Sequence, residues 1–380
     1  MTDLKPLRIL FFIPEDWYVC SHRLPLLRGA IAKGYEVVVV TRVTNHAGPI
    51  LETGARLVPA SLKRGFRNPL DDLVGLIELM RIYKREKPDI VHHVTPKSVL
   101  FGSLAAWLTR IPAVINALAG LGLLFASNKW YARLLRPIVA AAFRFLLARG
   151  NSQLIVQNRD DEEYFAGSLG IARQRIKLIR GAGVDVEEFH PVPAPPVPPY
   201  RVCVVSRMLF EKGIAEAVEA AVRIGESRDD VQILLAGEPD LDNPMGIPVA
   251  RLETWSKENN VEWLGRVSDV AGLVQGCHVA LLPTYYREGL PKSLLEAAAC
   301  GLPLVATDVA GCREICHDGV NGILIPPRDV PAIVEAVLRL IDDAGLRERM
   351  GHQSRALVES EFKVEKVVDQ TMDLYREMRV

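Results

Sequence analysis

Short runs rich in β-branched residues alternate with longer helical patterns along almost the whole chain. In the first half the expected strands are RILFFIP (8–14), EVVVVTRV (36–43), DIVHHV (89–94), PAVINAL (112–118), QLIVQN (153–158) and KLIRGAG (177–183), with helices near 70–87, 97–110, 130–149 and 160–169. A regular alternation of this kind is typical of a parallel sheet covered by helices. The pattern therefore predicts an α/β fold.

The alternation is interrupted by a proline-rich segment, HPVPAPPVPPY at 190–200, and then starts again. Such a segment cannot continue a sheet or a helix, but it suits a semi-rigid linker. The strands expected after it are RVCVVSRM (201–208), VQILLAG (231–237), VEWLGRV (261–267), HVALLPT (278–284), PLVATDVA (303–310) and GILIPP (322–327), with helices near 213–225, 248–258, 291–300 and 330–343. The chain is thus predicted to contain two doubly wound, Rossmann-like α/β domains.

A length of 380 residues suits two domains of ordinary size. We place the N-terminal domain at 1–190, the linker at 191–200 and the C-terminal domain at 201–363. The last segment, 364–380, is expected to form an amphipathic helix that packs back across the domains. Because ligands of such sheets bind beyond the carboxyl ends of the strands, two domains facing each other create an interdomain cleft, where we expect the functional site.

The net charge is zero, but the two halves of the chain have opposite charge. Residues 1–190 contain 26 lysines and arginines against 17 acidic residues, whereas residues 191–380 contain 20 against 29. Between 101 and 150 there are six basic residues and no acidic ones. The first half is therefore suited to an anionic partner such as a membrane surface, a nucleic acid or a phosphorylated acceptor.

The six cysteines are scattered without a CxxC pair, and the chain runs almost directly into its first strand. No apolar run reaches the roughly 18–20 residues of a membrane-spanning helix. These features predict a reduced, cytoplasmic protein. Cys312, Cys316 and His317 could ligate a metal, but no fourth ligand is evident, so buried thiols are the favoured interpretation and no metal site is predicted.

The segment TYYREGLPKSLLEAAACGLPLVATDVAGCREI, residues 284–315, holds the densest set of candidate binding groups. Pro291 is placed for the first turn of a helix. The backbone N–H groups around Gly289, Leu290 and Lys292 would point at the cleft, with the positive end of the helix dipole behind them. An anion or a hydroxyl-rich ligand suits this position.

Two glutamates flank the start of this helix. Glu288 precedes it, and Glu296 lies one to two turns inside it, in the otherwise apolar run LLEAAACG. Carboxylates accept hydrogen bonds from sugar and ribose hydroxyls. The alternative is a helix-start charge and a solvated face, but an unpaired acid in an apolar run is costly. We therefore favour a binding role for both.

A second candidate is SRMLFEKGI, residues 206–214, which follows the first strand of the second domain. Arg207 lies at the end of that strand and Lys212 five residues later. Both cations can converge on one diphosphate at the carboxyl edge of the sheet, Arg207 through its planar fork and Lys212 as a point charge. Either cation alone would be an ordinary surface charge.

Taken together, SRM-x3-KG, the two glutamates of EGLPKSLLE, CGLPLVATDVAG and NGILIPP resemble the donor-binding half of the retaining glycosyltransferases of family four, which have the GT-B fold. The first half is similar to the acceptor half of that family in CSHRLP (20–25), HHVTPKSVLFGSLAA (92–106), AGLG (119–122), QNRDDEEYF (157–165) and IRGAGVDVEEFHP (179–191). The chain most resembles the branch that builds lipid-linked oligosaccharides, for example by adding N-acetylgalactosamine to undecaprenyl-diphosphate-linked bacillosamine.

The resemblance implies a retaining transfer of a hexose or N-acetylhexosamine. The donor would be a UDP-sugar and the acceptor an undecaprenyl-diphosphate-linked saccharide, in capsule, O-antigen or protein-glycan assembly, with no obligatory cofactor or metal. By resemblance, Arg207 and Lys212 hold the donor diphosphate, Glu296 binds the ribose hydroxyls, and Glu288 with the backbone after it contacts the hexose. The family proposal is a front-face substitution in which the leaving diphosphate takes the acceptor proton, so catalysis is mainly charge stabilisation.

The acceptor side is less well defined. Many family members have a histidine before the glycine that follows the strand matching PAVINAL, but here the pair is Ala119-Gly120, so no general base is assigned. The candidates on this side are His22 in CSHR, Lys97 at a helix start where an acceptor phosphate could bind, and Gly120 and Gly122 in a turn that permits close backbone approach or is simply tight.

Two other motifs favour a structural interpretation. His92 and His93 alternate across a strand, so at most one of them faces the cleft. The segment PDLDNP, residues 239–244, contains an Asp-x-Asp of the kind that binds Mn²⁺ or Mg²⁺ in the other major glycosyltransferase fold. Within a doubly wound domain we interpret it as a loop near the donor, with no obligatory metal.

The segment WYARLLRPIVAAAFRFLLAR, residues 130–149, places Arg133, Arg136 and Arg144 within one helical arc among aromatic and aliphatic residues. Such a helix suits an anionic bilayer surface, although an arginine stripe is also typical of the solvated face of a packed helix. A polyprenyl-linked acceptor independently requires docking. We therefore expect peripheral attachment to the inner face of the cytoplasmic membrane and no nucleic-acid partner.

Three other functions are weighed against the transferase. A UDP-sugar 2-epimerase-like isomerase uses the same two-domain architecture, and product analysis without an acceptor would separate it. A dinucleotide-dependent oxidoreductase is disfavoured because no G-x-G-x-x-G follows the first strand of either domain. Release of the nucleotide would exclude a non-catalytic sugar-binding module.

Overall fold

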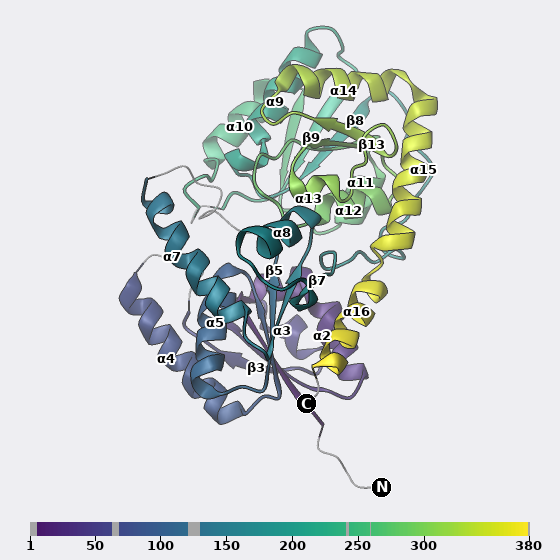
Figure 1. Ribbon diagram of the computed structural model, residues 1–380. Coiled ribbons are helices and arrows are strands. Elements are labelled where there is room, and N and C mark those ends of the chain that lie inside the picture. The colour runs from purple at the N-terminus through teal and green to yellow at the C-terminus, as the bar shows by residue number, and fades with distance from the viewer. Residues whose placement is uncertain (1–5, 63–67, 121–129, 241–242, 259, 379–380) are drawn as a thin grey trace. The chain divides into compact units, whose positions relative to one another are not determined.

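The computed structural model describes the chain apart from residues 1–5, 63–67, 121–129, 241–242, 259 and 379–380 (Figure 1). Its contacts divide the chain into two units. The first comprises Met1–Ala182 with Glu365–Val380, and the second comprises Gly183–Val364. Each unit is built on one parallel sheet, so the prediction of two doubly wound, Rossmann-like α/β folds is confirmed.

The sheet of the first unit has seven strands in the order β3-β2-β1-β4-β5-β6-β7. They are β1 (Arg8–Glu15), β2 (Glu36–Arg42), β3 (Arg56–Pro59), β4 (Ile90–Val94), β5 (Ala113–Leu118), β6 (Ser152–Val156) and β7 (Ile176–Leu178). The central strands are near-continuous apolar runs because both faces of the sheet are covered. The strand order reverses at β1, which pairs with β2 on one side and β4 on the other.

Helices cover both faces of this sheet. They are α1 (Asp16–His22), α2 (Leu24–Ala32), α3 (Ala47–Leu51), α4 (Pro69–Glu86), α5 (Pro96–Thr109), α7 (Trp130–Leu147), α8 (Arg159–Glu163) and α16 (Val364–Glu377). Alternate residues of β1 point to opposite faces of the sheet. Phe11 lies in the core formed with residues of α2 and α16, and Phe12 lies in the core formed with residues of α4 and α5. Helices α4, α5 and α7 are neighbours in the second layer (Figure 1).

The second unit repeats the design with six strands in the order β10-β9-β8-β11-β12-β13. The strands are β8 (Tyr200–Val205), β9 (Val231–Ala236), β10 (Val261–Gly265), β11 (Val279–Leu282), β12 (Leu304–Thr307) and β13 (Gly322–Ile325). The helices are α9 (Ile214–Gly225), α10 (Val249–Glu258), α11 (Val270–Gln275), α12 (Lys292–Ala299), α13 (Ala310–Arg313), α14 (Val330–Asp342) and α15 (Ala344–Glu361). The sequence pattern missed β3, which is short, and α15, which is largely polar. It also missed the helices α1, α2, α3, α11 and α13.

The chain passes between the units at residues 182–183 and 364–365, whereas the expected linker was 191–200. The stretch after Gly183 is bonded to the second unit. Arg355 Nη1 donates to the carbonyl groups of Val186 and Phe189 at 3.3 and 2.8 Å, and His278 Nε2 lies 3.2 Å from the Pro195 carbonyl oxygen. A proline-rich segment shows where helices and strands end, but it does not show which unit the segment packs against.

Within the described part of the chain, no helix combines the length and the hydropathy needed to cross a bilayer.

Candidate active site

Arg207 lies just beyond the carboxyl end of β8 and is paired with an acid from the neighbouring strand. Its Nη1 donates to Asp240 Oδ2 at 2.6 Å, and Asp240 follows β9 by four residues. The two side chains are 35% and 21% exposed, so a ligand can reach the guanidinium. The first aspartate of the Asp-x-Asp motif is thus the partner of Arg207, while Asp242 lies outside the described residues.

Lys212 ends a 3₁₀ turn, Phe210–Lys212, directly before Gly213 and α9. Gly213 has a φ of 74°, and a Cβ at this position would overlap the carbonyl group of Pro283. Only glycine therefore permits this close approach of the turn to the chain after β11. The approach brings Lys212 Nζ onto Glu288 Oε1, 76 residues away in sequence, and within 5.6 Å of the Tyr286 ring centroid.

Residues that the sequence did not single out hold Glu288 in place. Thr284 Oγ1 donates to Glu288 Oε1 at 3.3 Å and to the Glu211 carbonyl oxygen at 3.1 Å. The same carbonyl accepts the N–H groups of Tyr285 and Tyr286 at 3.1 and 3.2 Å. Thr284 follows the end of a strand, which is where sheets of this type bind ligands. That position could have identified Thr284 as a site residue from the sequence.

The Glu211 side chain is buried beside the two cations. Burial raises the pKa of its carboxyl group, and the charges of Lys212 and Arg207 oppose this shift. The sequence does not indicate that Glu211 is buried, because a glutamate next to a lysine usually lies in a solvated turn.

Pro291 directly precedes α12 instead of opening it, and its carbonyl oxygen accepts the N–H groups of Leu294 and Leu295 at 3.2 and 3.3 Å. The first amides of a helix have no acceptor within the helix, so those that follow Pro291 are available to a ligand. Gly289 and Leu290 lie in the turn before it, and a Cβ on Gly311 would come within 2.5 Å of the Gly289 carbonyl oxygen.

Glu296 is buried in α12, as its apolar neighbours predict, but it is not unpaired. Lys292, one turn earlier, donates to Glu296 Oε1 at 2.7 Å. Burial raises the pKa of Glu296, and the charge of Lys292 counteracts that effect. The lysine therefore keeps a buried carboxylate available as a hydrogen-bond acceptor.

Three pairs at the site each join a cation to a carboxylate of the same unit. The pairs are Arg207–Asp240, Lys212–Glu288 and Lys292–Glu296. Arg207 and Lys212 were predicted to face an anionic ligand, whereas for Lys292 the prediction concerned the backbone N–H group. At Arg207, which is 35% exposed, a diphosphate can take the place of the carboxylate with little loss, because exposed ion pairs contribute only about 0–1 kcal/mol. Lys212 and Glu288 are only 13% and 11% exposed, so there the diphosphate must replace the carboxylate as the partner of a largely buried cation. The arrangement suits reversible binding of a di-anionic ligand.

The acceptor-side candidates lie in the first unit and are not gathered into a comparable cluster. His22 ends α1, and its ring stacks on Tyr18 at 4.3 Å between centroids. Lys97 is buried in the first turn of α5 with its Nζ 2.5 Å from Asp72 Oδ1. Gly120 has a φ of 86°, which favours glycine, and Gly122 lies outside the described residues.

Both histidines of β4 are core residues. His93 contacts the Tyr83 hydroxyl oxygen at 2.9 Å and Asn116 Oδ1 at 2.8 Å, and His92 Nδ1 lies 2.6 Å from the Tyr375 hydroxyl oxygen.

Among the described residues, no group of three or more His, Cys, Asp or Glu side chains is arranged to hold a metal ion. Cys312 and Cys316 are fully buried in the core of the second unit. Burial raises the pKa of Cys316 to about 12, so this thiol stays protonated.

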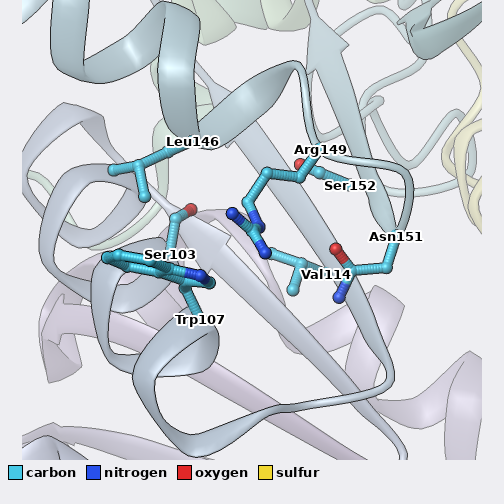
Figure 2. A pocket seen from close by; sticks show the side chains of 7 residues that line it. All are labelled: Ser103, Trp107, Val114, Leu146, Arg149, Asn151 and Ser152. Carbon is cyan, nitrogen blue, oxygen red and sulfur yellow. The ribbon is translucent and has the colours of Figure 1, made fainter.

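Figure 2 shows a pocket at the other end of the first sheet, where β5 and β6 begin. Val114 of β5 and Ser152 of β6 line it together with Trp107 of α5 and Arg149, which follows α7. The Arg149 guanidinium carbon lies 5.2 Å from the Trp107 ring centroid. Because parallel sheets bind substrates at the carboxyl edge, we assign this pocket to the outer surface and not to the active site.

Two family models match the chain, one in each unit. Residues 185–357 match the family described as glycosyl transferases group 1, and residues 8–158 match the family described as glycosyl transferase 4-like.

Curated relatives match at similar distances. The chain is 26% identical to N,N'-diacetylbacillosaminyl-diphospho-undecaprenol alpha-1,3-N-acetylgalactosaminyltransferase of Campylobacter jejuni, over 90% of this chain and 91% of the relative. It is 26% identical to the capsular polysaccharide biosynthesis glycosyltransferase CapM of Staphylococcus aureus, over 93% and 94%. It is 27% identical to UDP-Gal:alpha-D-GlcNAc-diphosphoundecaprenol alpha-1,3-galactosyltransferase of Escherichia coli, over 82% and 81%.

Solved structures agree on the fold. Anabaena HepE in complex with UDP superposes with a TM-score of 0.77 at 19% identity, covering 98% of this chain and 100% of that one. A glycosyltransferase from Rickettsia africae superposes with a TM-score of 0.79 at 16% identity, covering 99% of both chains.

Proposed function

Since the chain belongs to the group 1 glycosyl transferases, the retaining family four of GT-B fold that uses nucleotide-sugar donors, we propose that it moves a hexose or N-acetylhexosamine from a UDP-sugar to an undecaprenyl-diphosphate-linked saccharide. The assignment of a UDP-sugar donor rests mainly on one observation. Lys212 contacts Glu288 at the carboxyl edge of the second sheet. The acceptor is supported by two relatives, whose names specify diphospho-undecaprenol saccharides as substrates.

In this proposal Arg207 and Lys212 bind the donor diphosphate, replacing their contacts to Asp240 and Glu288. Glu288, released from Lys212 and still held by Thr284, accepts hydrogen bonds from the hexose together with the backbone of Gly289 to Lys292. As the glycosidic bond breaks, negative charge grows on the leaving diphosphate, and the two cations stabilise it.

No side chain is assigned as general base. Ala119 stands where many family members have histidine, and its methyl group cannot take a proton. A retaining front-face substitution needs no such group, because the leaving diphosphate oxygen takes the acceptor proton. Catalysis then depends on charge stabilisation and on positioning of the two substrates.

Glu296 is proposed to bind the ribose hydroxyls, and Glu296→Ala tests this assignment. A hydrogen bond to a charged group is worth about 1.5–3 kcal/mol, so the variant should bind UDP about 10- to 100-fold more weakly. Calorimetric titration with 2'-deoxy- and 3'-deoxy-UDP provides the control. If Glu296 contacts the ribose, wild type discriminates against at least one deoxy analogue, and the variant does not. Equal discrimination by both proteins would contradict the role.

We propose that the first unit docks on the inner face of the cytoplasmic membrane through the outer surface of α4, α5 and α7. In the described part of the chain, eight of the fourteen large apolar side chains that are exposed lie on these three neighbouring helices. They are Leu70, Leu73, Val74, Ile77, Trp107, Leu108, Ile138 and Phe145. Basic side chains are exposed among them, including Arg81, Lys84, Arg110 and Arg144. Apolar and basic groups on one surface favour an anionic bilayer.

This extends the expected docking segment 130–149 to α4, although the side chains of 130–135 lie outside the described residues. The double variant Val74→Glu with Ile138→Glu should bind phosphatidylglycerol vesicles at least about tenfold more weakly, because burial of one aliphatic side chain is worth about 1.5–3 kcal/mol. Co-sedimentation measures this. Val222→Glu, at an exposed position of α9, is the matched control. Unchanged binding of the double variant would exclude this surface.

The direct test of function incubates the protein with a panel of UDP-sugars, with and without short polyprenyl-diphosphate saccharides. We expect UDP release that depends on one donor and on the acceptor, together with a product heavier by one sugar. Conversion of the UDP-sugar itself without acceptor would instead indicate an isomerase.

A further inference from the structure

Arg23 is a buried cation with no counter-ion among the described residues. It lies between α1 and α2 and is 5% exposed. Its Nε is fully buried and makes no hydrogen bond, and the side chain forms no ion pair in the described part of the chain. Burying most of a cationic side chain without a carboxylate partner is unfavourable, because it loses much of its contact with water. Its retention therefore points to an anion that the fold itself does not supply.

His92 offers a second unpartnered nitrogen near Arg23. Its Nε2 is buried without a hydrogen bond, while its Nδ1 contacts the Tyr375 hydroxyl group. Burial holds the pKa of His92 well below its usual range, and the charge of Arg23 lowers it further, so the ring is neutral. Burial also raises the pKa of Tyr375, so its hydroxyl group stays protonated, and we assign that hydroxyl group as the donor to Nδ1. In that tautomer the hydrogen of His92 is on Nε2.

The buried acids at the end of β1 do not neutralise Arg23. Glu15 Oε2 accepts from Arg42 at 2.8 Å. Asp16 accepts from the Thr44 hydroxyl group at 2.7 Å and from its backbone N–H at 2.5 Å, and also from the His46 N–H at 3.1 Å. Both carboxylates are thus committed to other donors. This distinguishes Arg23 from Arg207, Lys212 and Lys292 of the second unit, each of which contacts a carboxylate.

We propose that Arg23 and the Nε2–H of His92 form a phosphate-binding site in the first unit, and that its ligand is a phosphate of the diphosphate group of the acceptor. The guanidinium fork can donate two parallel hydrogen bonds to phosphate oxygens, and the imidazole adds a neutral donor. The existence of the site follows from the buried donors. The identity of its ligand rests on the proposed function.

The test uses the full chain saturated with UDP, so that the donor site is occupied. Inorganic pyrophosphate and farnesyl diphosphate are titrated by calorimetry into wild type, Arg23→Met, Arg23→Lys and Arg28→Met. Arg28 is an exposed arginine of α2 and serves as the matched control. We expect R23M to bind both probes at least tenfold more weakly, R23K to be intermediate, and R28M to match wild type, with UDP affinity equal in all four.

The two probes separate the sources of the phosphate. Tighter binding of farnesyl diphosphate than of pyrophosphate supports a lipid-linked ligand, and equal binding overturns that part of the proposal. Unchanged affinity of R23M for both probes overturns the site itself. Because the readout is binding, failure of the protein to glycosylate any polyprenyl acceptor would leave this result intact.

Thermal unfolding without ligand gives an independent readout. Removal of an uncompensated buried charge should raise the midpoint of R23M by about 2–4 °C. An arginine with a merely structural role would instead lower the midpoint when replaced. A lower midpoint in both R23M and R23K would overturn the proposal, because their weaker binding would then reflect a loss of structure.

Discussion

Lys212→Ala is expected to lower turnover by about 10²–10³ while the protein stays folded, because removal of one preorganised group that stabilises developing charge costs about that much. Lys212 is 13% exposed and sits at the carboxyl edge of the second sheet, against Glu288. Its ammonium group is therefore partly desolvated before the donor binds, which strengthens its interaction with a leaving diphosphate. A UDP-sugar in solution has no such interaction, because its diphosphate is surrounded by water.

Initial-rate measurements over a range of UDP-sugar concentrations check this prediction, with the thermal midpoint as a test of folding. Lys257→Ala, on the exposed surface of α10, is the matched control and should leave kcat unchanged. The loss in Lys212→Ala should appear mainly in kcat, since the interaction is strongest in the transition state. Near-normal turnover would remove Lys212 from the diphosphate site.

Gly213→Ala is expected to destabilise the second unit and to lower activity with it. A positive φ costs an L-residue roughly 1–2 kcal/mol. The methyl group would also overlap the carbonyl group of Pro283, which adds about 1–3 kcal/mol of overpacking. The chain can relieve that overlap only by moving the turn that carries Lys212 away from the loop that carries Glu288.

Gly319→Ala separates the two contributions. Gly319 has a φ of 70°, close to that of Gly213, but no atom lies within 4 Å of a Cβ built there. The control should therefore show only the backbone cost. Urea unfolding should give a larger loss of stability for Gly213→Ala than for Gly319→Ala, accompanied by a lower kcat. Equal losses with normal activity would show that the close approach to Pro283 is not needed.

The positions of the proposed donor-binding residues in the fold were largely predictable from the sequence because the signals are local. Arg207 and Lys212 lie just beyond a recognisable strand, and Glu288 and Glu296 flank a recognisable helix start. Parallel strands all end at one edge of the sheet, so residues after β8 and β11 must come near each other. Glu211 and Thr284 were missed because they contribute a backbone carbonyl group and a hydroxyl group. Neither group is part of a recognisable sequence motif.

The acceptor side was much less predictable. The sequence favoured His22, but the structure gives the adjacent Arg23 the unusual environment. Neighbouring residues at the junction of two helices point in different directions, and only the packing of α1 against α2 and the sheet decides which of them is buried. Lys97 is likewise paired with Asp72 of another helix, a contact between residues 25 positions apart that spacing along the chain does not reveal.

The sequence by itself determined the class of fold, the order of most strands and helices, and the carboxyl-edge location of the proposed donor-binding residues. Those features follow from hydrophobic period and chain connectivity, which are properties of short segments. The tertiary structure alone decided which charges are neutralised and which remain alone. It also placed Tyr375 against His92, 283 residues earlier, and thereby assigned α16 to the first unit. Such pairings depend on how whole layers of helices pack. The local sequence of a segment does not show which distant segment it will contact.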